Sequence, residues 1–318
     1  MFSRFLTFMA GVHNVPSASF LGSAPPDTVR AAFDQDGIIY PATSSGAPPL
    51  RQPLIGNNYA WSLPLAFRRV GYAYSAPQIE AAMEQVATSV AQTAKSNAAN
   101  CLVVLVHGYN NSVEAAAKNF GQMRAKVASR KSLRPVFLEV YWDGLHRGPL
   151  TWPVPLLYWF DAMTYSNLAG QIGLRALLNR RPPELPLLFL THSRGAGVAF
   201  SCITDPVYDS HIRVGAHEES LLRRARAVAL VCLAPAVGNG HPLPDVRKAL
   251  PSNSSLGIGF NTRDPALQKS FIDERCFGDT PFGTDEKAYL EAARAVNADC
   301  EWLHRAIYRN YPKHDLHG

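Results

Sequence analysis

Apolar runs and helix-like repeats alternate along most of the chain. Mainly aliphatic runs, of the kind found in strands buried on both faces of a sheet, occupy residues 101–106, 135–141, 185–190, 225–233 and 256–260. A less regular segment at 301–308 is a further candidate strand. After Pro77, the residues Ile79, Met83, Val86 and Val90 recur at the spacing of one helix face. Similar patterns predict helices over 113–127, 161–179, 195–200 and 285–296.

The alternation of strands and helices predicts an α/β fold, with a mostly parallel central sheet and helices on both faces. Residues 76–318 carry this pattern and form the expected core. Residues 1–75 are rich in Pro, Gly, Ser and Ala, and their apolar pieces at 37–40 and 61–70 suit edge strands and connections. Since 47% of the 318 residues are hydrophobic and no long Gly/Ser linker divides them, we expect one compact unit that includes this extension.

A serine stands between the apolar run 185–190 and the small-residue run 195–200, in the sequence Thr191-His192-Ser193-Arg194-Gly195. A tight turn from a buried strand into a helix holds a serine Oγ at the sheet end, where a histidine can take its proton. The helix points backbone N–H groups at the negative charge that develops during attack. Ser193 is therefore the candidate nucleophile, and Gly195 would let helix and strand approach closely.

The run 101–106 leads into His-Gly-Tyr-Asn-Asn-Ser at residues 107–112, and a helix follows. Asn111 or Ser112 can cap that helix, and Glu114 complements its positive end. A strand, a His-Gly pair and then a helix is an arrangement that can present a backbone N–H to an oxyanion. The two motifs, about ninety residues apart, suggest one site.

At these two places the chain resembles the α/β-hydrolase superfamily. It is most similar to bacterial alpha/beta hydrolases of unknown function whose motifs read V-L-V-H-G-Y-N-N-S, matched by residues 104–112, and H-S-x-G, matched by residues 192–195. The resemblance covers roughly residues 100–318, and Thr191 stands where the usual pattern has its first glycine. It implies the α/β-hydrolase fold with an apolar insertion near the active site, and a hydrolytic triad. It also implies that the N–H groups of Tyr109 and Arg194 form the oxyanion hole.

The triad order in this family is serine, acid, histidine, with the acid following one of the two strands after the nucleophile strand. The end of the first such strand, residues 232–238, contains no carboxylate. The end of the second reads Phe-Asn-Thr-Arg-Asp-Pro-Ala-Leu at 260–267, so Asp264 is the expected acid. Two alternatives are that Asp264 caps the turn before Pro265 or pairs with Arg263.

The expected base is a histidine beyond the last strand, and His304, His314 and His317 are available. His314 lies in the loop after the candidate strand 301–308, from which an imidazole can reach over the strand ends, so it is preferred. His304 would lie inside that strand, and His317 close to the end of the chain. His107 and His192 flank the two motifs, where structural roles are expected for both.

Aromatic side chains gather between residues 142 and 160. Trp142 ends a predicted strand beside the expected position of Ser193, and Trp152 and Trp159 bound a segment rich in Pro, Leu and aromatic residues. Such a segment can form a lid or an acyl-binding wall, or it can be a helix packed on the sheet. An aromatic-walled cleft favours esters with an apolar part over charged peptides.

Charge and cysteine content narrow the classes of partner. Lys and Arg outnumber Asp and Glu by 31 to 25, and the surplus lies in residues 101–200. Arg180-Arg181 and residues 126–131 could meet an anionic surface or nucleic acid, but without interleaved aromatic residues a solvated helix face is preferred and no nucleic-acid partner is expected. Five cysteines without a C-x-x-C pair favour a reducing, cytoplasmic setting and argue against a zinc site.

Neither the N-terminal stretch nor the hydropathy along the chain indicates a secreted or membrane-spanning protein. The stretch Phe-Leu-Thr-Phe-Met-Ala-Gly-Val at residues 5–12 is a marginal signal-like pattern, for which a first strand or a buried tail is the preferred interpretation. No run of eighteen apolar residues is present, so we expect no membrane-spanning helix.

Together these features predict a serine hydrolase that cleaves small-molecule carboxylic esters through an acyl-enzyme on Ser193, in an esterase-like or lipase-like manner. The chemistry requires no cofactor and no metal. An amidase or thioesterase would use the same triad, and a catalytically silent α/β-hydrolase that binds a ligand is the alternative from another class.

Overall fold

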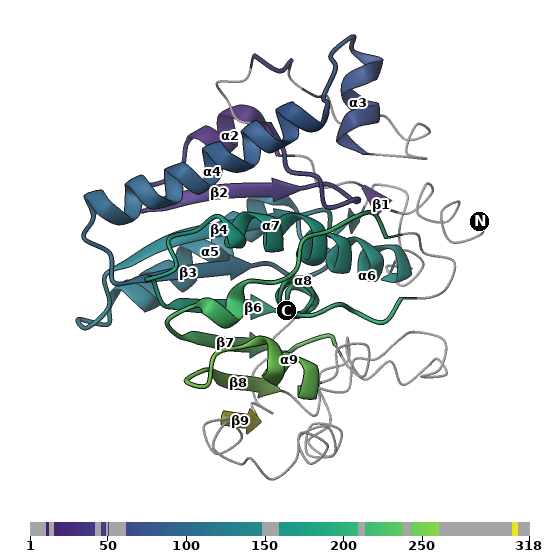
Figure 1. Ribbon diagram of the computed structural model, residues 1–318. Coiled ribbons are helices and arrows are strands. Elements are labelled where there is room, and N and C mark those ends of the chain that lie inside the picture. The colour runs from purple at the N-terminus through teal and green to yellow at the C-terminus, as the bar shows by residue number, and fades with distance from the viewer. Residues whose placement is uncertain are drawn as a thin grey trace.

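The structure is a computed structural model that describes residues 11–12, 16–41, 46–48, 50, 62–147, 159–208, 214–237, 243–260 and 307–310. Its centre is a seven-stranded sheet with the order β2-β4-β3-β6-β7-β8-β9 (Figure 1). Every neighbouring pair is parallel. The strands are β2 (Thr28–Phe33), β3 (Cys101–Val106), β4 (Pro135–Trp142), β6 (Leu187–His192), β7 (Val228–Leu233), β8 (Ser255–Phe260) and β9 (Ile307–Asn310). A separate antiparallel pair joins β1 (Gly11–Val12) to β5 (His146–Arg147).

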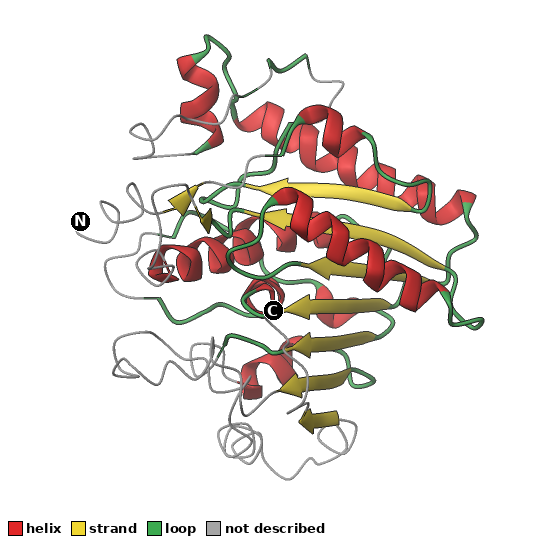
Figure 2. Ribbon diagram, turned by 180° about the vertical axis from the view of Figure 1, so that it is seen from behind, coloured by secondary structure: helices red, strands yellow, loops and turns green. Residues whose placement is uncertain are grey.

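Helices cover both faces of the sheet. One face packs against α4 (Ala76–Ser96), α6 (Trp159–Leu168), the π-helical segment Ala169–Leu174, α7 (Arg175–Asn179), α8 (Gly195–Ile203) and α9 (Leu243–Ala249). The other face packs against α2 (Ala18–Gly22), α3 (Leu63–Arg69) and α5 (Val113–Ala128). Figure 1 shows α4 and α7 in front of the sheet and α5 behind it, and Figure 2 gives the opposite view. The prediction of a parallel α/β sheet covered on both sides is confirmed.

The central strands form where the aliphatic runs predicted them. All six residues of β3 are buried, because β4 and β6 flank the strand and helices cover both of its faces. Opposite Val106, at the end of β3, stand Val140 of β4 and Thr191 of β6. The loops that follow these strands therefore meet at one edge of the sheet.

Two predicted helix starts are confirmed by their caps. The Ser112 side chain accepts a hydrogen bond from Ala115 N–H (3.2 Å) and caps α5, so Ser112, and not Asn111, is the capping residue. Ser75 precedes α4, and Gln78 closes the turn by accepting from the Ser75 N–H (2.7 Å).

The N-terminal strand predictions are wrong in detail. The edge strand is Thr28–Phe33; within 37–40 only Ile39 forms a bridge, to Phe33, and 62–70 contains the helix Leu63–Arg69. Arg30 and two alanines interrupt the apolar pattern of β2, so hydrophobic periodicity does not indicate this strand. The Arg30 charge is accommodated by Glu139 on β4, at 2.9 Å, and by the ring of Phe20.

The remaining elements differ at their ends. The predicted helix over 161–179 is a continuous helical run from Trp159 to Asn179 that includes the π-helical turn. Gly170 and Gly173 in this turn pack directly against α8 and Phe33, where a Cβ would clash. The last strand runs to Asn310, two residues beyond the predicted end. The predicted helix 285–296 and residues 301–306 lie outside the described residues.

The described part of the chain contains no helix long and apolar enough to cross a membrane. Arg180, considered as part of an anion-binding surface, forms ion pairs with Glu80, Glu84 and Glu218 at 2.7 to 3.0 Å. Arg181 is buried. These two arginines therefore do not form an open basic surface.

Candidate functional site

Ser193 follows directly on β6, at the edge where the parallel strands end. Its backbone has φ +50°, which non-glycine residues rarely adopt. Its N–H donates to the Leu233 carbonyl (2.9 Å), and its carbonyl accepts from Ala196 and Ala236 N–H (3.1 Å each). The turn is therefore fixed by its own helix and by the segment that follows β7.

Backbone strain is concentrated at this edge. Five non-glycine residues of the described chain have positive φ, and four of them lie within four residues after the end of a strand: Asn110 (+59°), Leu145 (+49°), Ser193 (+50°) and Ala234 (+45°). Each such residue costs about 1–3 kcal/mol, which persists only where the surroundings enforce the geometry. Strain of this kind gathers at functional sites, so the edge formed by β3, β4, β6 and β7 is the candidate site.

Two glycines bring the 107–112 loop against the Ser193 turn. A Cβ on Gly108 would lie 2.9 Å from Ser193 Cβ and 3.0 Å from His192 Nδ1. A Cβ on Gly195 would lie 2.5 Å from the His107 carbonyl oxygen and 2.7 Å from that of Val106. The two motifs found in the sequence are thus in direct contact.

His107 is buried and holds its loop in place. Trp142 donates its backbone N–H to His107 Nε2 (3.2 Å), so Nε2 accepts and the proton is on Nδ1, 2.8 Å from the Gly108 carbonyl. Burial lowers the pKa of His107 to about 4, opposed by the hydrogen bond to Gly108 and the nearby Asp143. The imidazole is therefore neutral near pH 7, and the structural role expected for His107 is confirmed.

Trp142 does not offer a surface to a substrate. Its indole stacks on the His107 ring, with centroids 5.6 Å apart and planes at 11°, and donates to the His107 carbonyl (2.8 Å). Only 1% of the residue is exposed. The expectation that Trp142 contacts substrate is therefore corrected. Its position at the end of a strand suggested exposure, but the His107 ring stacks on the indole and buries it. The ring supports the 107–112 loop instead.

Trp159 and Tyr109 lie edge to face, with ring centroids 5.0 Å apart. Trp159, from α6, also packs with Ala234 and Ala236 in the segment after β7. This small apolar cluster joins α6, the 107–112 loop and the β7 end around the Ser193 turn. Trp152 lies outside the described residues.

The other expected triad residues lie outside the described residues: Asp264, His314, His304 and His317. The strands that precede the acid and the preferred base are described, and they are parallel neighbours with Phe260 opposite Asn310. Leu233 pairs with both His192 and Gly259, so β6 to β9 end at one edge. Asp264 and His314 each follow these ends by four residues and stay predictions.

Two buried ionisable groups at this edge were not singled out from the sequence. Asp143, 1% exposed, follows Trp142 at the end of β4. The Arg194 side chain, 3% exposed, lies beneath the Ser193 turn. Arg194 was expected to contribute only its backbone N–H, and nothing local in the sequence indicates where its guanidinium lies.

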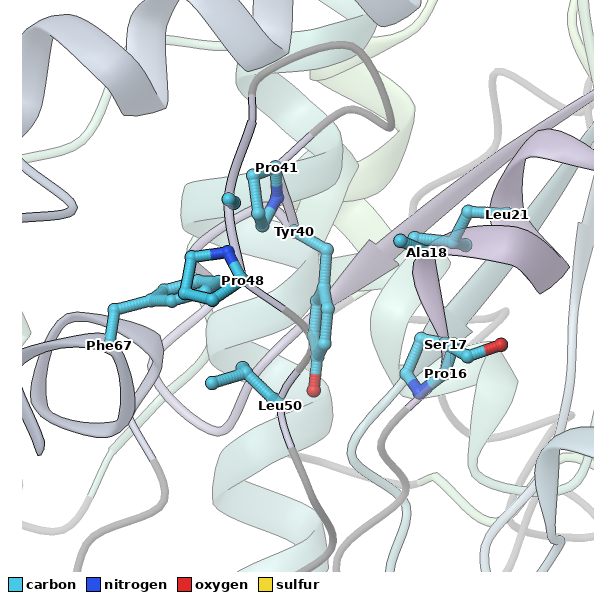
Figure 3. Close-up of a pocket in the computed structure, with 10 residues that line it drawn as sticks. Pro16, Ser17, Ala18, Leu21, Tyr40, Pro41, Pro48, Leu50 and Phe67 are labelled. Atoms are coloured by element: carbon cyan, nitrogen blue, oxygen red, sulfur yellow. The ribbon is translucent and has the colours of Figure 1, made fainter. Parts of the chain in front are cut away.

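An apolar pocket lies elsewhere, where α2, α3 and the segment near Tyr40 meet (Figure 3). Its walls include Leu21, Tyr40 and Phe67, and none of its lining residues belongs to the Ser193 turn or the 107–112 loop. It is therefore separate from the candidate site. Among the described residues, no group of three or more His, Cys, Asp or Glu side chains could hold a metal ion.

The buried thiols are not candidate nucleophiles. Cys202 and Cys232 are fully buried, and burial raises the pKa of each to about 12. A thiol with such a pKa is protonated near neutral pH and reacts poorly.

Comparison with known proteins gives no assignment: no protein-family model matches the chain, and no curated protein matches it.

Proposed function

We propose that the chain is a serine hydrolase of the α/β-hydrolase fold that cleaves carboxylic esters through an acyl-enzyme on Ser193. The observation that carries the proposal is the Ser193 backbone, with φ +50° directly after a buried central strand and before a helix. A serine strained in this way, at the strand-end edge of a parallel sheet, is the geometry of a nucleophile elbow. The contacts of Gly108 and Gly195 with the neighbouring turns add support.

In the proposed reaction, Ser193 Oγ attacks the ester carbonyl while a histidine, His314 by preference, takes the hydroxyl proton. Asp264 orients the imidazole and stabilises its charged form. The carbonyl oxygen becomes an oxyanion that accepts from the N–H groups of Tyr109 and Arg194. The C–O bond to the alcohol breaks as the imidazolium gives the alcohol its proton, and water then hydrolyses the acyl-serine by the same steps.

The described surroundings favour a substrate with an apolar part. The half-buried ring of Tyr109 forms an aromatic wall beside the Ser193 turn, and it packs on the buried cluster of Trp159, Ala234 and Ala236. An apolar wall near the carbonyl favours neutral acyl or alcohol groups. Trp152 is an additional candidate for the wall, whereas Trp142 and Trp159 are both buried, and Trp159 supports the wall through its contact with Tyr109.

The proposal is tested by steady-state kinetics on p-nitrophenyl acetate, butyrate and octanoate, with a matched amide and a thioester. We expect the esters to be hydrolysed fastest and Ser193→Ala to lower their turnover by about 10⁴ to 10⁶-fold. Ser201→Ala, at a buried serine on α8, the helix that follows Ser193, is the control and should retain activity. Faster hydrolysis of the amide or the thioester would identify an amidase or a thioesterase instead. Folded wild-type protein without activity on any of these substrates would favour a binding module.

A further inference from the structure

Arg194, the residue after the proposed nucleophile, has a guanidinium that is buried among neutral oxygens. Its Nε donates to Ser166 Oγ (2.7 Å) and its Nη2 to Asn167 Oδ1 (2.6 Å) and the Met163 carbonyl (3.3 Å). Its Nη1 donates to the Ala236 carbonyl (3.0 Å). Within the described residues, no carboxylate forms an ion pair with it.

A buried cation that no carboxylate of the described residues neutralises is costly. Burial lowers the pKa of Arg194 to about 10, which still leaves the guanidinium protonated at neutral pH. Desolvating such a charge costs several kcal/mol, which hydrogen bonds to neutral oxygens offset only in part. A methionine or leucine would fill similar volume without that cost. What only the guanidinium supplies is a simultaneous connection to several segments.

The guanidinium connects two elements to the Ser193 turn. Three of its four acceptors, on Met163, Ser166 and Asn167, belong to consecutive turns of α6. The fourth is the carbonyl of Ala236, in the segment after β7. The Ala236 N–H in turn donates to the carbonyl of Ser193 (3.1 Å). Ala236 is thus held by both residues of the turn.

The helix held in this way also supports the aromatic wall. Trp159 lies one turn before Met163 on α6, and its ring packs on Tyr109. The Arg194 side chain therefore links, through α6, the two residues whose N–H groups are the proposed oxyanion donors. Loosening α6 would move the wall and disturb the relative position of the donors.

We propose that the Arg194 side chain is a positioning residue that fastens α6 to the nucleophile turn and thereby sets the apolar wall of the substrate site. The effect on substrates rests on the proposed esterase function, whereas the fastening of α6 does not. Gly197 supports the assignment, because a Cβ there would lie 2.8 Å from Arg194 Cζ. The glycine on α8 leaves the space that the guanidinium fills.

The test compares Arg194→Met, Arg194→Lys and Gly197→Ala with the control Arg175→Met. Arg175 is equally buried at 3% exposure, but it donates to the carbonyls of Ser201 and Cys202 at the far end of α8. All four variants retain the backbone N–H at position 194, which is a proposed oxyanion donor. Amide hydrogen exchange over residues 159–168 measures the fastening directly, and kcat/KM for octanoate against acetate esters measures the wall.

We expect Arg194→Met to accelerate exchange in α6 and to lower the octanoate-to-acetate ratio of kcat/KM by about tenfold. Arg194→Lys should fall between this variant and the wild type, and Gly197→Ala should shift both readouts in the same direction. Arg175→Met should leave exchange in α6 and the ratio near wild-type values. Unchanged exchange in folded Arg194→Met, or in Gly197→Ala if the first variant does not fold, would overturn the proposal. Wild-type protein without esterase activity would refute the proposed function, while exchange would still decide the fastening.

Discussion

Gly195→Ala probes the contact between the two motifs. The added Cβ would lie 2.5 Å from the His107 carbonyl oxygen and 2.7 Å from that of Val106, whereas ordinary contacts are about 3.5 Å. Both oxygens belong to the backbone at the end of β3, which cannot rotate away, so the start of α8 has to shift. Overpacking of this kind costs about 1–3 kcal/mol, and the higher helix propensity of alanine returns at most about 1 kcal/mol. We expect a net loss of about 1–2 kcal/mol.

Urea unfolding followed by circular dichroism gives the free energy of unfolding. The matched control is Gly121→Ala within α5, where the nearest atom to the added Cβ is Arg124 Nη2 at 3.8 Å. That variant should be as stable as the wild type, or more stable by up to about 1 kcal/mol. Because the shift moves Ser193, Gly195→Ala should also lower ester kcat/KM by about 10 to 100-fold. If Gly195→Ala matches the wild type in stability and activity, the close contact on which the site rests is absent.

Further predictions concern the acid, the base and a buried imidazole. Asp264→Asn should lower ester turnover by about 10⁴-fold, whereas Asp245→Asn, on the exposed side of α9, should not; the opposite result in steady-state kinetics would place the acid one strand earlier. His314→Ala should remove activity that His304→Ala retains, and the reverse would place the base before β9. Burial lowers the pKa of His107 to about 4 from 6.5, so the free energy of unfolding should be greatest above pH 6.5 and fall by about 3 kcal/mol toward pH 4. His107→Gln should lose this dependence in urea titrations, and equal pH dependence in both proteins would disprove the effect.

The sequence was most informative for the inner strands of the sheet. The strand β3 is buried on both faces, and β6 and β7 alternate buried and half-buried residues that are nearly all apolar, so each of the three is an apolar run in the sequence. The edge strand β2 has no such run, because Arg30 in its middle is balanced by Glu139 on a strand more than a hundred residues away. A pattern read along one segment cannot reveal a partner at that separation.

The same limit applies to the site. The Ser193 turn and the 107–112 loop were predicted because their residue types and spacing are local properties. The guanidinium of Arg194 was not, since its acceptors come from α6 and from the segment after β7. The expectation for Trp142 was wrong for a related reason: strand position indicates where a side chain begins, while its packing on His107 depends on the neighbouring loop.

The central claim is that Ser193 is the nucleophile, and covalent labelling tests it most directly. Folded protein is treated with a fluorophosphonate probe and digested with trypsin, and the tryptic peptide that ends at Arg194 is analysed by mass spectrometry. The account predicts one phosphonyl adduct, located on Ser193, which Ser201→Ala keeps and Ser193→Ala loses. An adduct on another residue, or folded wild-type protein that stays unlabelled, would contradict it.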